Sequence, residues 1–198
     1  MRSVFKPVLA FVLGLFLALP ATAQTNNAAE QFVAGNIGAG ISILNDTSLD
    51  ADARTARFEA FLLDNTDLGR IAIFTLGNAP ASPAQRDAFT AAFRDYAMAA
   101  YRSYFRNYSG QSLRVTGSRQ NAPGDVIVHT LLSDGAAILP VDFRVRTEGA
   151  KPVVLDIGIA GVWLAVTQRD DFAAFLARNN NDVAGLTAYL SAKASAAR

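Results

Sequence analysis

Few residues of this chain could do acid–base or nucleophilic chemistry. The sequence has one histidine, His129, and no cysteine, which removes thiolate catalysis and cysteine-bound metals. Asp142 and Asp156 fall on expected β-strands, and both side chains could reach one face of a sheet. A carboxylate buried in an apolar hollow can act as a general base with a shifted pKa. Strand alternation instead places Asp142 opposite the inward-facing Phe143, so we expect both aspartates to face solvent and assign no catalytic residue.

Two motif-like stretches lack the context that their chemistry needs. The glycines of Gly35-x-x-Gly38-x-Gly40 follow no strand and lie within a helical pattern, so they do not predict a dinucleotide site. The stretch Gly40–Leu44 lacks the second glycine of a nucleophile elbow. We expect His129, the one histidine, to lie on the outer side of the sheet. A single histidine with scattered aspartates does not predict a metal site. We therefore expect no metal and no cofactor.

The first 23 residues predict export. Arg2 and Lys6 make a basic start, an apolar run follows from Val8 to Leu19, and Ala21-Thr22-Ala23 is a small-x-small cleavage site. A membrane anchor is the alternative, but the run is shorter than the roughly 20 apolar residues that a spanning helix needs. We predict a cleaved signal peptide over residues 1–23. Its removal leaves acidic and basic residues nearly balanced, so the charge does not indicate a nucleic-acid partner.

Residues 24–198 are expected to form a single domain. Helical spacing of apolar residues, with caps at Asp50 or Ser48, at Gly77 and at Ser82, predicts helices at 29–44, 51–63, 68–76, 82–105, 170–178 and 183–193. Alternation predicts strands at 113–119, 126–132, 138–146 and 152–162. Short turns between successive strands make an antiparallel meander. The expected fold class is α+β: a curved antiparallel sheet of about four strands, packed with several helices around an apolar cavity, like the cone-shaped folds of the nuclear-transport-factor type.

The stretch Leu155–Phe172 is more apolar than a strand end approaching water should be. Residues Val162–Val166 are apolar on both faces, and the whole chain is 51% hydrophobic with 13 phenylalanines. Aromatic residues at helical spacing, such as Phe89 and Phe93, are more typical of a protein core than of a ligand wall. The apolar excess therefore indicates a large core, a pocket or a partner interface, and composition does not choose among them.

Five short motifs, in order along the chain, resemble the MlaC or toluene-tolerance family. They are Phe58–Leu63 followed by Asp67, Ile71–Gly77, Ser82–Phe89 followed by Phe93 and Tyr101, Asp156–Val162, and Arg169–Phe172. The chain departs from the family pattern at Trp163, where a small serine is usual, and at Gln168, where an aromatic residue is common. It also has Asn78-Ala79-Pro80 where the family has an aromatic–basic pair.

The resemblance implies a periplasmic phospholipid carrier and no reaction. Such a carrier moves phospholipid between an outer-membrane lipoprotein complex and an inner-membrane ABC transporter, and so maintains outer-membrane lipid asymmetry. The phospholipid headgroup is expected to stay in water, because the sequence shows no conspicuous cationic cradle. Val162–Val166 would be covered partly by helices and partly by lipid tails. The residues expected to contact the lipid are Phe61, Ile71, Phe74, Phe93, Ala97, Tyr101, Tyr104, Val128, Val141, Phe143, Ile157, Ile159, Val162 and Trp163.

Two other functions fit the same sequence. A small hydrolase or isomerase on a cone-shaped fold would use Asp142 or Asp156 as its base. An assembly or scaffold protein would bind a protein partner through the apolar strand end around Trp163.

Overall fold

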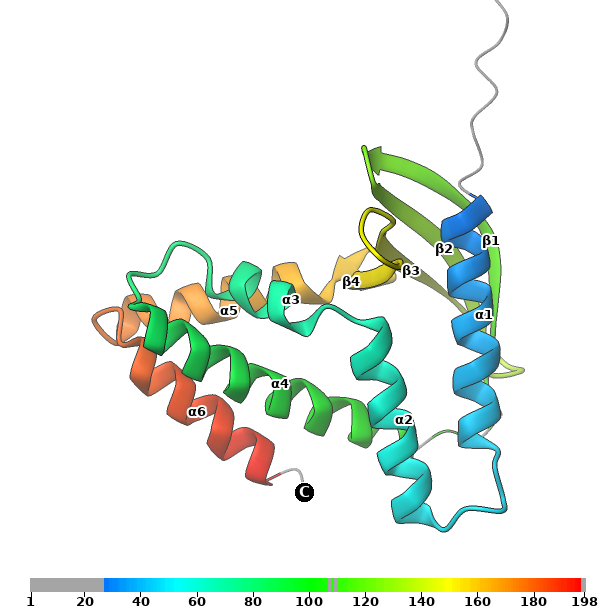
Figure 1. Ribbon diagram of the computed structural model, residues 1–198, viewed down its shortest axis with the longest axis horizontal. Coiled ribbons are helices and arrows are strands. Elements are labelled where there is room, and N and C mark those ends of the chain that lie inside the picture. The colour runs from blue at the N-terminus through cyan, green and yellow to red at the C-terminus, as the bar shows by residue number, and fades with distance from the viewer. Residues whose placement is uncertain (1–26, 107, 109, 197–198) are drawn as a thin grey trace, which may run out of the picture.

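The architecture comes from a computed structural model that describes residues 27–106, 108 and 110–196, so the predicted signal peptide lies outside the described residues. Within this part of the chain, six helices and five strands follow in the order helices, sheet, helices (Figure 1). The helices are α1 (Asn27–Leu44), α2 (Ala51–Asn65), α3 (Leu68–Leu76), α4 (Pro83–Arg106), α5 (Leu164–Arg178) and α6 (Val183–Ala196). The strands are β1 (Ser112–Ala122), β2 (Asp125–Ser133), β3 (Ile138–Arg146), β4 (Val153–Ile159) and β5 (Val162–Trp163). The α+β class and the antiparallel sheet are confirmed.

The sheet is a curved meander in which each strand pairs with its sequence neighbour, in the order β1-β2-β3-β4-β5. Its fifth strand was not predicted. The fourth predicted strand ends early because Ala160 and Gly161 both take positive φ, 49° and 84°, and form a tight turn. Val162 and Trp163 then pair back onto Ile159 and Gly158. A two-residue turn with both residues at positive φ matches the right-handed twist of a hairpin.

The helix boundaries follow from the caps that the sequence predicts. The Asp50 side chain accepts a hydrogen bond from the Ala53 N–H (2.7 Å) at the start of α2. Ser82 and Gln85 form a reciprocal capping box at the start of α4, with bonds of 2.9 and 3.2 Å. Gly77 ends α3 with φ 63°, and its N–H bonds the Ile73 carbonyl. These three caps are confirmed.

Two apolar cores hold the molecule together. The larger joins α3, α4, α5 and α6, which gather on one side of the molecule in Figure 1. At its centre, the rings of Phe89 and Phe93 meet the edge of Phe172 at 5.8 and 6.4 Å between centroids. The smaller core packs Ala29 and Val33 of α1 onto the sheet. Helix α2 lies between the two cores (Figure 1). Among the described residues, no helix is long and apolar enough to cross a membrane.

The start of α5 differs from the prediction, which placed it at Asp170. The helix begins at Leu164, where its own N-cap residue, Trp163, gives no side-chain bond. Asp156 on β4 takes that role from a distance, because its Oδ1 accepts the N–H groups of Ala165 (2.9 Å) and Ile157 (2.8 Å). The sheet thus fixes the start of the helix through a side chain that is remote in sequence.

Gly158 is required by the close approach of Trp163. A Cβ added at Gly158 would lie 3.2 Å from the Trp163 ring. We expect Gly158→Ala to destabilise the protein by about 1–2 kcal/mol, which lowers Tm by roughly 3–6 °C. Since Trp163 is the only tryptophan in the chain, its emission should shift with the displaced ring. Thermal melts followed by fluorescence measure both effects.

Gly35→Ala is the matched control for this change. A Cβ at Gly35, inside α1, would meet nothing within 4 Å. That variant should gain helix stability of about 0.5–1 kcal/mol and keep its emission spectrum. Gly158→Ala melting and emitting like the wild type would show that the ring does not rest on the glycine.

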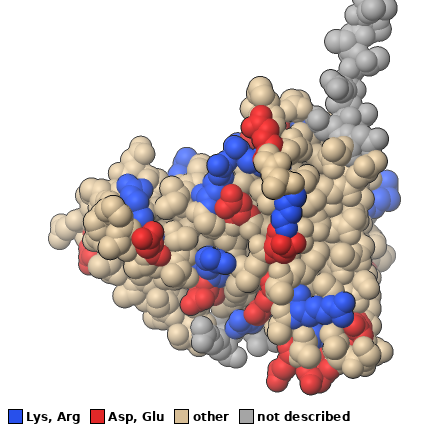
Figure 2. Space-filling model, in the orientation of Figure 1, with Lys and Arg blue, Asp and Glu red and all other residues tan. Residues whose placement is uncertain are grey.

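Charged side chains of both signs are interspersed on the face shown in Figure 2. They gather over α2 and the connection between α1 and α2, where Arg57 pairs with Asp46 at 3.2 Å. No single-sign patch dominates this face, in keeping with the near-zero formal charge of the chain.

Candidate functional site

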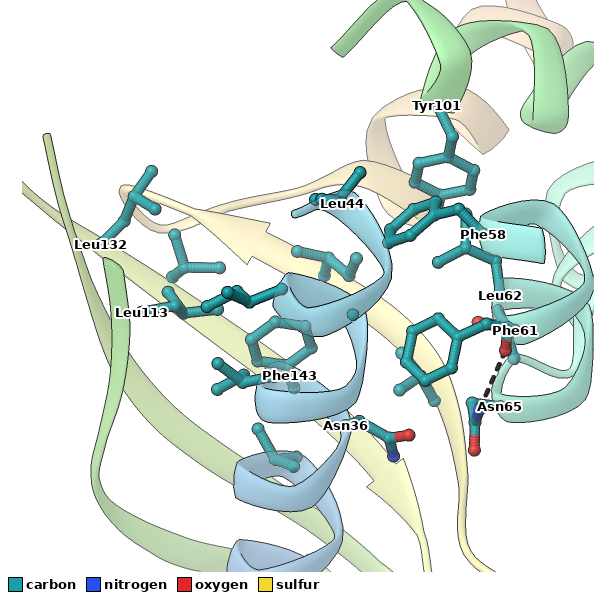
Figure 3. Close-up of a pocket in the computed structure, with 18 of the residues that line it drawn as sticks. Asn36, Leu44, Phe58, Phe61, Leu62, Asn65, Tyr101, Leu113, Leu132 and Phe143 are labelled. Atoms are coloured by element: carbon teal, nitrogen blue, oxygen red, sulfur yellow. Dashed lines mark hydrogen bonds between the residues drawn. The ribbon is translucent and has the colours of Figure 1, made fainter. Parts of the chain in front are cut away.

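An apolar cavity lies between α1 and the sheet, with α2, the end of α4 and the start of α5 on its other sides (Figure 3). Its volume is about 360 Å³, within the range of about 300–1,000 Å³ that ligand pockets occupy. The sheet lines it with Leu113, Leu132, Val141, Phe143, Val154, Ile157 and Ile159. The helices line it with Phe32, Val33, Ile37, Gly40, Ile41, Leu44, Phe58, Phe61, Leu62, Tyr101 and Leu164.

The polar groups on the cavity wall are few and uncharged. They include Asn36, Asn65, Thr66 and Gln111, and none of the described lining residues carries a charge. The Asn65 amide donates to the Phe61 carbonyl at 2.8 Å, so part of its polarity is already satisfied within α2 (Figure 3). Such a wall suits hydrocarbon and disfavours a charged or strongly polar guest.

Strand register explains why one face of the sheet lines the cavity. Phe143 stands opposite Val128 and Ile157 on its two neighbouring strands, and Val141 stands opposite Thr130 and Ile159. Residues paired in this way point to the same face, which we call the cavity face. The intervening residues, including Asp142, Arg144 and Asp156, point to the opposite face.

Helix α1 completes the wall with a stripe of apolar residues. Val33, Ile37, Ile41 and Leu44 recur at helical spacing and all line the cavity. Gly40 lets α2 approach, since a Cβ there would lie 3.4 Å from the rings of both Phe58 and Phe61. The α1 residues were not among the predicted lipid contacts, although their spacing in the sequence was the available signal.

The structure brings together six of the predicted lipid-contacting residues. Lining the cavity are Phe61, Tyr101, Val141, Phe143, Ile157 and Ile159. Ile71, Phe93 and Ala97 pack instead in the core of α3–α6, and Val128 is buried between α1 and the sheet. The side chain of Tyr104 lies outside the described residues.

Three further predicted contacts lie elsewhere. Phe74 is 36% exposed, with the Arg169 guanidinium 5.1 Å from its ring centroid. Val162 is 55% exposed on the short strand β5, and Trp163 rests on Gly158. Within the apolar segment Val162–Val166, Leu164 is the residue that lines the cavity.

The two aspartates of the hydrolase hypothesis do not line the cavity. Asp142 is half-buried and its Oδ1 lies 2.9 Å from Nδ1 of His129, on the opposite face of the sheet. Asp156 is 7% exposed, so the prediction that it faces solvent is wrong. Burial raises the pKa of the Asp156 carboxyl, although its two main-chain hydrogen bonds and the charge of Arg144 act to lower it. Neither of the two carboxylates that could serve as a base lines the apolar cavity.

Asp125 and Arg144 form a two-point ion pair on the same opposite face. Nε and Nη2 of Arg144 donate to Asp125 Oδ2 at 3.0 and 2.6 Å. Burial alone would raise the pKa of Asp125, but hydrogen bonds from Arg144 and Asn121 and the nearby guanidinium charges outweigh it and lower that pKa. This network joins strands β2 and β3 and is structural. Among the described residues, no group of three or more His, Cys, Asp or Glu side chains could hold a metal ion.

Two of the departures from the family pattern have structural partners. Trp163 packs on Gly158, as described above. Gln168 on α5 accepts a hydrogen bond from the Tyr96 hydroxyl of α4 at 3.2 Å. Neither Trp163 nor Gln168 is on the cavity wall, so both departures adjust packing around α5.

Known proteins share this combination of fold and sequence. A solved structure of a phospholipid-binding protein from Ralstonia solanacearum, in complex with a phospholipid, is similar with a TM-score of 0.75 at 20% sequence identity. The match covers 85% of this chain and 98% of that one, which shows a shared fold. Comparison with curated protein sequences gives no match. A protein-family model described as MlaC protein matches residues 36–192. The chain therefore belongs to the MlaC family, and the resemblance inferred from its motifs is confirmed.

Proposed function

We propose that this protein binds a phospholipid by its acyl chains and carries it through the periplasm. The observation that supports the proposal most strongly is the cavity of about 360 Å³ with an apolar, uncharged wall. Family membership and the phospholipid in the Ralstonia solanacearum structure support the same ligand class.

The energetics of extraction explain why such a cavity is needed. Each methylene taken from hydrocarbon into water costs about 0.8 kcal/mol, so an acyl chain of some 16 carbons resists water by more than about 10 kcal/mol. A carrier must offset that cost with an apolar surface of its own. Side chains from four strands and from helices α1, α2, α4 and α5 together supply that surface here.

The finer parts of the proposal follow from the family. Residues 1–23 act as a signal peptide, and the mature protein exchanges lipid with an outer-membrane lipoprotein complex and an inner-membrane ABC transporter. No catalytic role is proposed, because Asp142 and Asp156 point away from the cavity face.

Transfer between vesicles tests the carrier function. The mature protein, stripped of lipid, is mixed with donor vesicles that contain a fluorescent phospholipid and with unlabelled acceptor vesicles. We expect the transfer rate to rise in proportion to protein concentration, because each molecule carries its own cargo through water. Reconstituting the two membrane complexes in the vesicles should accelerate transfer further.

Two results would contradict the proposal. A rate that does not respond to added protein would reject a carrier and favour the scaffold alternative. Release of fatty acid or another cleaved product during the assay would reject a purely binding function.

A further inference from the structure

A second hollow, of about 610 Å³, adjoins the apolar cavity beside the C-terminal ends of α1 and α4. Leu44, Phe58 and Tyr108 line both spaces, so the two meet at these three side chains. These three side chains therefore form the boundary between the two spaces, and the headgroup of a ligand with its tails in the apolar cavity would enter the second space by passing Leu44 and Phe58.

The second hollow differs from the first in its chemistry. Four charged residues line it, Asp52, Arg54 and Glu59 from α2 and Arg102 from α4, and we call it the charged hollow. None of the described residues that line the apolar cavity is charged. The pair of spaces thus changes from hydrocarbon-like to ionic across a single shared boundary, as a phospholipid does between its tails and its headgroup.

The two arginines of the charged hollow are held differently. Arg102 forms an ion pair with Glu59, in which the side chains are 31% and 21% exposed, and the bond with Glu59 raises the pKa of Arg102. Arg54 is half-buried, and its Nη1 donates to the main-chain oxygen of Asp46 at 3.3 Å. No described carboxylate lies within ion-pair distance of Arg54. Its remaining N–H donors are therefore available to a phosphate, which a guanidinium can bind at two points.

We propose that the charged hollow binds the headgroup of the phospholipid, and that it favours a zwitterionic headgroup over an anionic one. Arg54 holds the phosphate with Arg102 beside it, and Glu59 receives the ammonium group. The inference rests on the proposed function, and it replaces the expectation that the headgroup simply stays in water.

Charge balance gives the preference for a zwitterion. The hollow carries two guanidinium groups and two carboxylates, so its formal charge is zero. A headgroup with one phosphate and one ammonium group keeps the hollow neutral. An anionic headgroup without an ammonium group sets two carboxylates and a phosphate against two guanidinium groups, and partly desolvated groups tolerate this excess negative charge poorly.

Loading from mixed vesicles tests the inference. Stripped mature protein is incubated with vesicles of equal parts phosphatidylethanolamine and phosphatidylglycerol with identical acyl chains, and the bound lipids are quantified. The wild type should take up the zwitterionic lipid preferentially. Glu59→Gln should reverse the preference, since the hollow then carries a net positive charge. Arg54→Gln should lower uptake of both lipids by about fivefold, because both carry the phosphate.

Arg57→Gln is the matched control. Arg57 lies on the same helix and pairs with Asp46, but it lines neither space. It should leave the amount and the ratio of bound lipids unchanged. Melting curves establish that each variant is folded, and if Glu59→Gln is not, Arg54→Gln decides alone.

The outcomes separate this inference from the proposed function. Equal lipid amounts and ratios in all folded variants would place the headgroup elsewhere while leaving the lipid carrier intact. A wild type that takes up no lipid would overturn both. An arm with inorganic phosphate and no lipid distinguishes a free-anion site: a rise in Tm with phosphate that Arg54→Gln abolishes, without any change in bound lipid, would also overturn the headgroup assignment.

Discussion

Ile157→Asp should empty the cavity of lipid while leaving the protein folded. Ile157 is half-buried on the cavity face of β4, where its side chain contributes to the apolar wall. Protonating an aspartate of ordinary pKa at pH 7 costs about 4 kcal/mol, and in a half-buried position we expect about half of that, a loss of ~30-fold in lipid affinity. In the empty cavity, water hydrates the carboxylate, so folding is affected less than binding.

The matched control is the same substitution outside the cavity. Ile73 on α3 is 41% exposed and does not line the cavity, so Ile73→Asp should retain the lipid of the wild type. Phe93→Asp would not be an informative alternative, because Phe93 is 5% exposed in the core of α3–α6 and its replacement should unfold the protein. Lipid phosphorus per mole of protein is the measurement. An Ile157→Asp variant with undiminished lipid would mean that the ligand lies somewhere else.

Asp156→Ala should destabilise the protein by about 2–3 kcal/mol, or roughly 5–10 °C in Tm. The substitution removes the one oxygen that accepts hydrogen bonds from the N–H groups of both Ala165 and Ile157. It therefore leaves the start of α5 without a cap. Asp156→Asn keeps an acceptor oxygen at the same place and should lose less. Equal melting temperatures for Asp156→Ala and the wild type would refute the capping role.

The pH dependence of the same group has a defined sign. Burial raises the Asp156 pKa above 3.8 in the folded state only, so folded protein binds this proton more tightly than unfolded protein. The stability that its protonation contributes is fully present below pH 3.8 and is lost as the pH rises through the raised pKa. Asp156→Asn cannot titrate, so its stability relative to the wild type should increase over that window. Denaturant unfolding at a series of pH values measures the difference.

Local sequence rules predicted most of the elements of this fold. The capping box at Ser82 and the glycine at Gly77 fixed their helix ends because each cap depends on residues adjacent in sequence. Period-two alternation predicted the meander because each strand pairs with its neighbour. The start of α5 was missed because Asp156 caps it from another strand, a contact that local patterns do not contain.

The sequence predicted that the fold encloses an apolar cavity, but it predicted only some of the residues that line this cavity. Alternation on β3 and β4 correctly grouped Val141, Phe143 and Ile157 on one face. The apolar residues on α4 could not be divided in the same way. Its aromatic stripe widens past half the helix, so Phe93 enters the helical core whereas Tyr101 reaches the cavity. That division depends on where α2 and α6 pack, which is a tertiary outcome.

The charged hollow had no recognisable sequence signal. Arg54 and Glu59 lie in a helix with an ordinary alternation of charged and apolar residues, and Arg102 is far from them along the chain. Only the packing of α4 beside α2 brings Arg102 to Glu59.

The native mass of the protein purified from the periplasm shows whether the apolar cavity holds a phospholipid. We expect the molecule, kept intact in mild conditions, to carry the added mass of one phospholipid, and we expect this mass to be lost in Ile157→Asp but not in Ile73→Asp. A wild-type protein whose mass equals that of its polypeptide alone, when purified without detergent, would show that the cavity does not hold a phospholipid.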